Sequence, residues 1–152
     1  MAPDRGESVA FTNAYAGNLK DIAELLKVYQ EKTGKDTVSL AKEIGVLLGG
    51  ERELYDSVEK KRKLLTDYAM SCVHDISGEK MEVPVKILIE SLLEKAEWML
   101  EHIRDTEWVT DSDGNGWFNG YYDNHGRRVE GEMEQGVRMM LTSQVFAVMA
   151  GT

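Results

Sequence analysis

Aromatic, amide and carboxylate side chains gather in a glycine-rich run over residues 116–131, which reads GWFNGYYDNHGRRVEG. A pyranose presents apolar C–H faces that stack on aromatic rings, and hydroxyl groups that need hydrogen-bond donors and acceptors. The glycines allow tight turns and a close approach of the backbone to a ligand. This composition predicts a carbohydrate-binding cleft, and the residues that we expect to line it are Trp117, Tyr121, Tyr122, Asp123, Asn124 and Arg127.

The same run has a purely structural interpretation, which is a tight β-hairpin whose aromatic side chains pack on a neighbouring helix. Residues 123–126, which read DNHG, are typical of the turn in such a hairpin. For each candidate, a role in the hairpin is at least as well supported as stacking on a sugar or hydrogen bonding to its hydroxyls. The residue types alone therefore leave both interpretations open.

Residues 111–116, which read DSDGNG, match the opening of an EF-hand calcium loop. The twelfth position of such a loop should be a bidentate glutamate, and here it is Tyr122. We therefore favour a plain polar turn, and a calcium-responsive module through Asp111, Asp113 and Asn115 stays the weakest alternative. The histidines are far apart in the sequence, so no metal site and no cofactor are predicted.

Charge and composition limit the partners. The chain of 152 residues carries 18 Lys and Arg against 27 Asp and Glu, and this net charge of −9 argues against a nucleic-acid partner. The basic run over residues 60–63 is expected to be the solvated face of a helix.

Nothing in the sequence indicates a membrane or an oxidising compartment. No apolar run approaches the ~20 residues of a membrane span, and the first residues lack the apolar core of a signal peptide. Cys72 is the single cysteine and is predicted to be a small buried hydrophobe. We therefore expect a soluble, cytoplasmic protein with no membrane partner.

The elements that must position the candidate residues are mostly helical. Apolar residues recur at steps of three and four and predict helices over residues 8–32, 37–48 and 51–73, and a fourth from Pro84 to about residue 107. The predicted core faces of the first and second helices are Tyr15, Leu19, Ile22, Leu26 and Tyr29, and Leu40, Ala41, Ile44, Leu47 and Leu48. Those of the third and fourth are Leu54, Val58, Leu65, Tyr68 and Cys72, and Val85, Leu88, Leu92, Ala96, Met99 and Ile103.

The pattern changes after residue 107. Residues 108–142 are rich in glycine, aromatic and turn residues, which predicts a hairpin region with a further short strand over 137–142. Residues 143–152 are predicted to begin another helix. No Pro- or Ser-rich linker divides the chain, so a single domain over residues 1–152 is expected.

Four stretches of the sequence carry a resemblance to a known family. They are SVAFTNAYAGNL from residue 8, AEWMLEHIR from residue 96, the run 116–131, and GVRMMLTSQVFAVMAG from residue 136. In this collinear order they resemble part of the catalytic domain of the inverting β-glucoside phosphorylases, the cellobiose and cellodextrin phosphorylase family. The likeness runs along nearly the whole chain.

The resemblance implies a mainly α fold that is a segment of an (α/α)6 barrel, with the glycine-rich hairpin as an insert. The helices expected here are too few to close such a barrel, so 1–152 would be a single partial catalytic domain. Helices without their partners should leave a larger apolar surface exposed than a monomer normally shows. The rest of the catalytic domain or a second copy of the chain is the implied protein partner.

The resemblance also implies an activity. In that family inorganic phosphate is the co-substrate that attacks a β-linked glucoside, and the only catalytic group required is an acid in an Asp-Trp-Asn-Asp-type segment. No such segment occurs here, and the family order would put it before Met1. Asp123 and Glu130 could act as acids, but neither matches the catalytic position. We therefore expect no catalytic residue in this chain, an inactive isolated fragment, and a carbohydrate as the small-molecule partner.

A rival hypothesis from another functional class is a small, non-catalytic helical module that binds sugar or a protein. Acidic, amphipathic helices fit this hypothesis equally well. A monomer that unfolds cooperatively would favour the module, whereas a fragment should aggregate or recruit a complementary piece.

Overall fold

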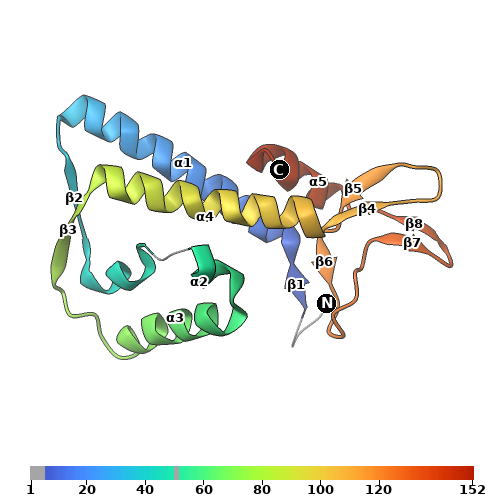
Figure 1. Cartoon of the computed structure of the whole chain (residues 1–152), viewed down its shortest axis with the longest axis horizontal. Helices are drawn as coiled ribbons and strands as arrows, with labels where there is room; N and C mark the ends of the chain where they lie inside the picture. Colours follow the sequence, from blue (N-terminus) through green and yellow to red (C-terminus); the bar gives the residue numbers. More distant parts are fainter. Residues whose placement is uncertain (1–5, 50–51) are drawn as a thin grey trace. The chain divides into compact units, whose positions relative to one another are not determined.

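The computed structural model describes residues 6–49 and 52–152 and is mainly α with short antiparallel sheets (Figure 1). The predicted mainly α class is therefore confirmed. Contacts divide the chain into two compact units, the first formed by residues up to Asp21 together with Glu94–Thr152, and the second by Ile22–Leu93. The first unit contains the whole run 116–131 and so carries all of the candidate residues.

Helix α1 spans Val9–Thr33, close to the predicted range 8–32. Its first turn is capped by Ser8, whose hydroxyl accepts a hydrogen bond from the Phe11 amide at 3.2 Å. Beyond its end lies Gly34, whose φ of +65° is a conformation that glycine adopts without steric cost. Local signals at both ends therefore determine the extent of this helix.

The buried face of α1 differs from the predicted one. The periodicity places Tyr15 and Ile22 in the core, but they are 62% and 45% exposed, while Leu19, Leu26 and Tyr29 are half-buried. The buried side of the helix carries small residues instead: Ala10, Asn13, Ala16 and Ala23. Small side chains allow neighbouring backbones to approach closely, so side-chain size and not hydropathy decides which face is buried.

Helix α4 spans Val85–Thr106 and begins directly after Pro84, the last residue of a strand. Here the periodicity is a good guide to the core. Val85, Leu88, Ala96 and Ile103 are buried as predicted, and Leu92 and Met99 are half-buried.

In the second unit, the predicted helix over 37–48 is wrong. Residues Thr37–Ala41 form strand β2, which pairs antiparallel with β3, Lys80–Pro84, and the two lie side by side in Figure 1. Only the 3-10 helix η1, Lys42–Leu47, remains of the prediction. A run of apolar residues this short suits a strand as well as a helix, and a partner strand some forty residues away decides between them.

The predicted helix over 51–73 is divided in two. Helix α2 spans Arg52–Asp56 and α3 spans Val58–Ser71, and Gly50 and Glu51 lie outside the described residues. Ser57 separates them, because its backbone is extended and its side chain accepts a hydrogen bond from the Lys60 amide at 3.2 Å. Neither helix buries a residue, and Cys72 is half-buried where a fully buried side chain is predicted.

The first unit also contains short strands that pair two by two. The chain passes through β4, Trp108–Thr110, and β5, Gly116–Phe118, which pair with each other, as do β7, Gly131–Met133, and β8, Gly136–Arg138. Strand β6, Tyr121–Tyr122, pairs with β1, Glu7–Ser8, at the start of the described chain. The strand predicted over 137–142 is thus shorter than expected, because helix α5 already begins at Leu141 and continues to Ala150.

The core cluster of the first unit joins residues of three helices. Ala16 of α1, Leu100 of α4 and Ala150 of α5 pack together with Met99 beside them. Lys20 donates a hydrogen bond to the Ala150 carbonyl at 3.0 Å, which satisfies one of the carbonyl groups left unpaired at the end of α5. The large apolar side chains of α5 point elsewhere and are exposed: Leu141, Val145, Val148 and Met149.

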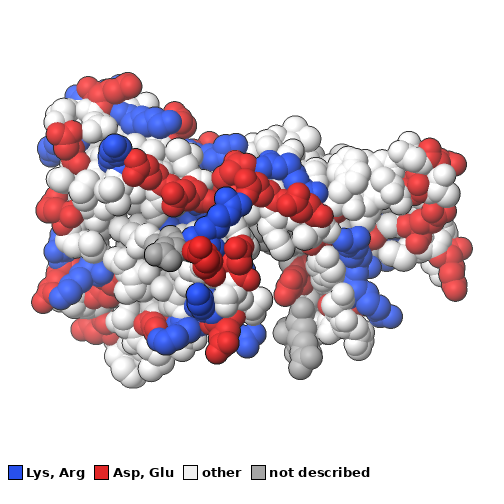
Figure 2. All heavy atoms as spheres, in the orientation of Figure 1, with Lys and Arg blue, Asp and Glu red and all other residues white. Residues whose placement is uncertain are grey.

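Charges of both signs are interspersed on the face shown in Figure 2, without a continuous basic surface there. The basic run 60–63 lies on α3, where Lys63 forms an ion pair with Asp67 at 2.5 Å and both side chains are exposed. Within the described residues, none of the helices is both long and apolar enough to span a bilayer.

Candidate functional site

The predicted turn over residues 123–126 is present and is organised by Asp123. Its Oδ1 accepts hydrogen bonds from the amides of His125 at 2.8 Å and Arg127 at 3.0 Å, and its Oδ2 accepts one from Arg127 Nε at 2.9 Å. Gly126 takes φ +71° at the point where the chain reverses. Hydrogen bonding from the Arg127 amide is the main cause that lowers the pKa of Asp123 to about 2, although the carboxyl group is close to solvent.

An open pocket of about 780 Å³ lies beside this turn. Strand pairing creates it, because Glu7 is opposite Tyr122 and Ser8 is opposite Tyr121, and the Ala10 amide donates to the Gly120 carbonyl at 3.1 Å. The start of α1 therefore forms one wall and the turn forms another. The lining residues are Gly6, Glu7, Ser8, Phe11, Tyr121, Tyr122, Asp123, Asn124, His125, Val129 and Met140.

Four of the predicted cleft residues lie at this pocket, namely Tyr121, Tyr122, Asp123 and Asn124. Arg127 is not among the lining residues; its guanidinium is exposed and is held by the ion pair with Asp123 at 2.8 Å. Trp117 is not among them either. The pocket therefore brings together four of the six predicted cleft residues, and sugar binding by any of them stays a prediction.

Trp117 belongs to the core of the first unit, where it is 5% exposed on β5. The hairpin around it is closely packed, since a side chain at Gly116 would come within 2.2 Å of the Trp108 ring. Trp108 in turn packs edge-on against Phe118 with ring centroids 4.9 Å apart. For this tryptophan the structural interpretation of the run is the better one.

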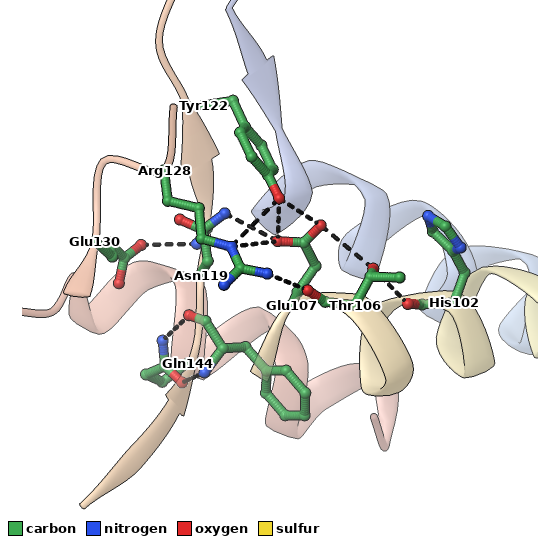
Figure 3. A network of polar contacts seen from close by, with 10 residues as sticks. His102, Thr106, Glu107, Asn119, Tyr122, Arg128, Glu130 and Gln144 are labelled. Atoms are coloured by element: carbon green, nitrogen blue, oxygen red, sulfur yellow. Dashed lines mark hydrogen bonds and ion pairs between the residues drawn. The ribbon is translucent and has the colours of Figure 1, made fainter. Parts of the chain in front are cut away.

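A buried carboxylate, Glu107, interacts with Tyr122 of the pocket lining (Figure 3). Its side chain accepts hydrogen bonds from the Tyr122 hydroxyl at 3.0 and 2.9 Å and from Asn119 Nδ2 at 3.0 Å. The Arg128 guanidinium approaches the same carboxylate at 3.9 Å and donates a hydrogen bond to the Thr106 carbonyl. A buried charge needs such partners to offset its loss of hydration.

A second buried carboxylate, Glu130, is 1% exposed and holds three donors. The amides of Gly120 and Met140 each donate to it at 2.8 Å, and the Ser143 hydroxyl donates at 2.9 Å. Gly120 is adjacent to Tyr121, and Met140 itself lines the pocket. Glu130 therefore connects two separate parts of the pocket wall with the start of α5.

Neither carboxylate suggested as an acid by the sequence is placed to protonate a leaving group. Asp123 has a pKa of about 2 and is ionised throughout the physiological range. Glu130 is fully buried among backbone donors and is absent from the pocket lining. What the pocket offers chemically is aromatic rings beside amide, carboxylate and backbone polar groups.

The EF-hand-like segment forms the turn of the β4–β5 hairpin. Asp111 accepts hydrogen bonds from the Asn115 amide at 2.8 Å, the Asn115 side chain at 3.0 Å and the Asp113 amide at 3.1 Å. These bonds lower the pKa of Asp111, and the bond from the Asn115 side chain has the largest effect on it. Among the described residues no cluster of metal-ligating side chains is present. The polar-turn interpretation accounts for these contacts.

Several residues of the site gave no usable signal in the sequence. Glu7, Ser8 and Phe11 reach the pocket only because β1 pairs with a strand more than a hundred residues away. Glu107 is one acidic residue among many at the end of an amphipathic helix. His125, in contrast, could have been included, because it lies in the predicted turn between the candidates Asn124 and Arg127.

No protein-family model matches the sequence, and no curated protein matches it either.

Proposed function

We propose that this chain is the carbohydrate-cleft portion of the catalytic domain of an inverting β-glucoside phosphorylase. The observation that carries the proposal is the pocket, in which the aromatic residues Tyr121 and Tyr122 lie beside the amide of Asn124 and the carboxylate of Asp123. Aromatic faces next to fixed polar groups are what recognition of a pyranose requires.

The packing of the helices supports the same proposal. Helix α5 turns Leu141, Val145 and Val148 to solvent while it buries alanine and serine. An exposed apolar stripe at steps of four and three is what a helix shows when its partner is missing. A segment of an (α/α)6 barrel would carry such stripes.

In the intact enzyme, a phosphate oxygen would attack the anomeric carbon as the glycosidic bond breaks, and an acid would protonate the leaving oxygen. The products would be an α-sugar 1-phosphate and a shortened sugar. This chain would contribute the sugar-binding wall and not the acid. We therefore expect no turnover from the isolated chain.

Sugar binding can be measured directly by NMR titration of the isotope-labelled chain with cellobiose. We expect shift changes centred on residues 121–125, and an affinity about three- to tenfold weaker in Tyr121→Ala, because a stacking ring is lost. Asn124→Ala should weaken binding to a similar extent. Tyr15→Ala is the matched control, since Tyr15 is an exposed tyrosine of the same unit outside the pocket.

The result that would contradict the proposal is a wild-type chain that shows no shift change at millimolar cellobiose while it remains folded. Equal weakening by Tyr15→Ala would also count against it, because the effect would then not belong to the pocket.

A second candidate is a non-catalytic helical module that binds sugar or protein. The exposed apolar residues of α5 favour it, since they could be the surface that meets a partner. Sedimentation and calorimetry distinguish the candidates. A monomer with a single cooperative transition favours the module, and a chain that self-associates favours the incomplete domain.

A further inference from the structure

Tyr122 belongs both to the pocket and to the buried network behind it. The residue lines the pocket, but its hydroxyl donates to the two carboxylate oxygens of Glu107 at 3.0 and 2.9 Å. Glu107 is 7% exposed and is not a lining residue. Figure 3 shows the hydroxyl directed at this carboxylate. The polar end of the side chain is therefore engaged behind the wall that the residue helps to form.

Glu107 is itself held firmly. Its amide donates to the Ile103 carbonyl at 2.9 Å, which continues the hydrogen bonding of α4, and its carbonyl accepts from the Asn119 amide at 2.8 Å. The Asn119 side chain, which is fully buried, donates to Oε2 at 3.0 Å. The backbone of Glu107 is therefore fixed, and its carboxylate cannot move without breaking the bonds from Asn119 and Tyr122.

The backbone of Tyr122 is fixed as well. It pairs with Glu7 on one side and forms an isolated bridge with Arg128 on the other. A side chain that is held both at its backbone and at its hydroxyl has little conformational entropy left to lose when a ligand binds. Binding to a preordered ring avoids the entropy cost of ordering it.

We propose that Glu107 is a positioning residue for the pocket, which fixes the Tyr122 ring so that this residue meets a sugar with its aromatic ring and not with its hydroxyl. The part that concerns the sugar rests on the proposed function, whereas the fixing of the ring does not. Burial is the main cause that raises the pKa of Tyr122, so the phenol stays protonated and keeps donating to Glu107 at neutral pH.

The contact between the Tyr122 phenol and the Glu107 carboxylate, on which the fixing of the ring depends, is tested without any ligand. In a chain with labelled tyrosine rings, NMR follows the ionisation of the Tyr122 phenol, assigned with Tyr122→Phe. Removal of the Glu107 charge should lower the phenol pKa, because the nearby carboxylate favours the protonated form and Arg128 opposes it. We expect the lower value in both Glu107→Gln and Glu107→Ala, and a value identical to wild type in either folded variant would overturn the inference.

The sugar-binding role is tested by cellobiose affinity in the same variants. Tyr122→Phe and Glu107→Ala should each weaken binding about three- to tenfold, the range expected when one ordinary hydrogen bond that positions the ring is lost. The double variant should be no weaker than the single ones, because both changes remove the same contact. Glu107→Gln keeps an acceptor oxygen for the phenol and should restore most of the affinity.

A different result would overturn the assignment. If Tyr122→Phe weakens binding and both Glu107 variants bind like wild type, the hydroxyl contacts the sugar directly. If the effects of the two single changes multiply in the double variant, Glu107 acts by another route. A wild-type chain that binds no cellobiose refutes the proposed function alone, and the phenol titration still decides whether the Glu107 carboxylate holds the Tyr122 hydroxyl. Should Glu107→Ala fail to fold, Glu107→Gln still supplies the phenol titration, and Glu107→Leu, which removes the acceptor and fills a similar volume, supplies the affinity measurement.

Discussion

At the scale of single residues, the carboxylate of Asp123, a predicted sugar-binding group, forms its hydrogen bonds within its own turn. Both of its carboxylate oxygens accept hydrogen bonds from within residues 123–127. The residue types that suit sugar binding also suit a turn, because aspartate and asparagine hydrogen-bond readily to nearby amides. The same turn that uses the carboxylate also forms a wall of the pocket.

Asp123→Asn should therefore destabilise the fold in a pH-dependent way. The folded pKa of about 2 lies below the ordinary value of about 3.9, so the carboxylate stabilises the folded state above about pH 4. This stabilisation is lost as the pH falls from about 4 to about 2. Urea unfolding at several pH values should show a wild-type advantage that is constant near neutrality and shrinks over that interval.

Asp113→Asn, in the other polar turn, is the control, and it should leave the difference from wild type small at every pH. An advantage over Asp123→Asn that stays the same down to pH 2 would show that the charge of Asp123 does not stabilise the turn.

At the scale of elements, one glycine allows the strand segment and α5 to come together. A side chain at Gly120 would lie 1.8 Å from the Ser143 hydroxyl and 2.7 Å from Glu130 Oε1. The Gly120 amide instead donates to Glu130, and Ser143 donates to the same oxygen. The side chain of Gln144 completes this junction, because it bonds to both backbone groups of Phe118 at 3.0 and 2.8 Å (Figure 3).

Gly120→Ala should consequently be among the most damaging small substitutions in the chain. We expect a loss of at least about 1–3 kcal/mol in the free energy of unfolding, as for other overpacked sites, measured by chemical denaturation. Gly17→Ala is the matched control, since its side chain would meet Ala150 at an ordinary 3.5 Å within a helix. That change should be neutral or slightly stabilising, because alanine favours helix over glycine. Equal losses in both variants would refute this description of the junction.

At the scale of the whole molecule, apolar residues are distributed in an unusual way. Helices α1 and α5 meet through small residues such as Ala16, Gly17 and Ala150, with Leu100 of α4 packed beside them. Large apolar side chains of α5 remain in solvent, with Val148 81% exposed. Exposed apolar stripes of this kind mark surfaces that bind another element.

Changes on this stripe should alter association and leave folding intact. Val148→Lys and Leu141→Lys should each reduce concentration-dependent self-association, measured by light scattering, with little change in melting temperature. Ala147→Lys is the contrasting variant. Ala147 lies on the same helix but is buried, so a lysine there should disrupt the packing of α5 and lower the melting temperature. Scattering that is unaffected by both surface changes would mean that the stripe is not the contact surface.

Much of the local structure was predictable, and particular residues show why. The extents of α1 and α4 follow from helical periodicity with Ser8, Gly34 and Pro84 at the ends, and the DNHG turn follows from its residue types. Strand β2 was not predictable, because its apolar run becomes a strand only through pairing with β3. The split between α2 and α3 depends on one serine that acts as a cap and not as a helical residue.

The sequence by itself therefore determined the mainly helical class, the two long helices and the turn over residues 123–126, since these depend on neighbours within a few positions. Only the tertiary structure decided which face of α1 is buried, that Trp117 belongs to the core, and that Glu107 supports Tyr122. These features depend on close packing and on hydrogen bonds between residues far apart in the chain. Periodicity records which residues could be buried, whereas the partner helix or strand decides which of them are.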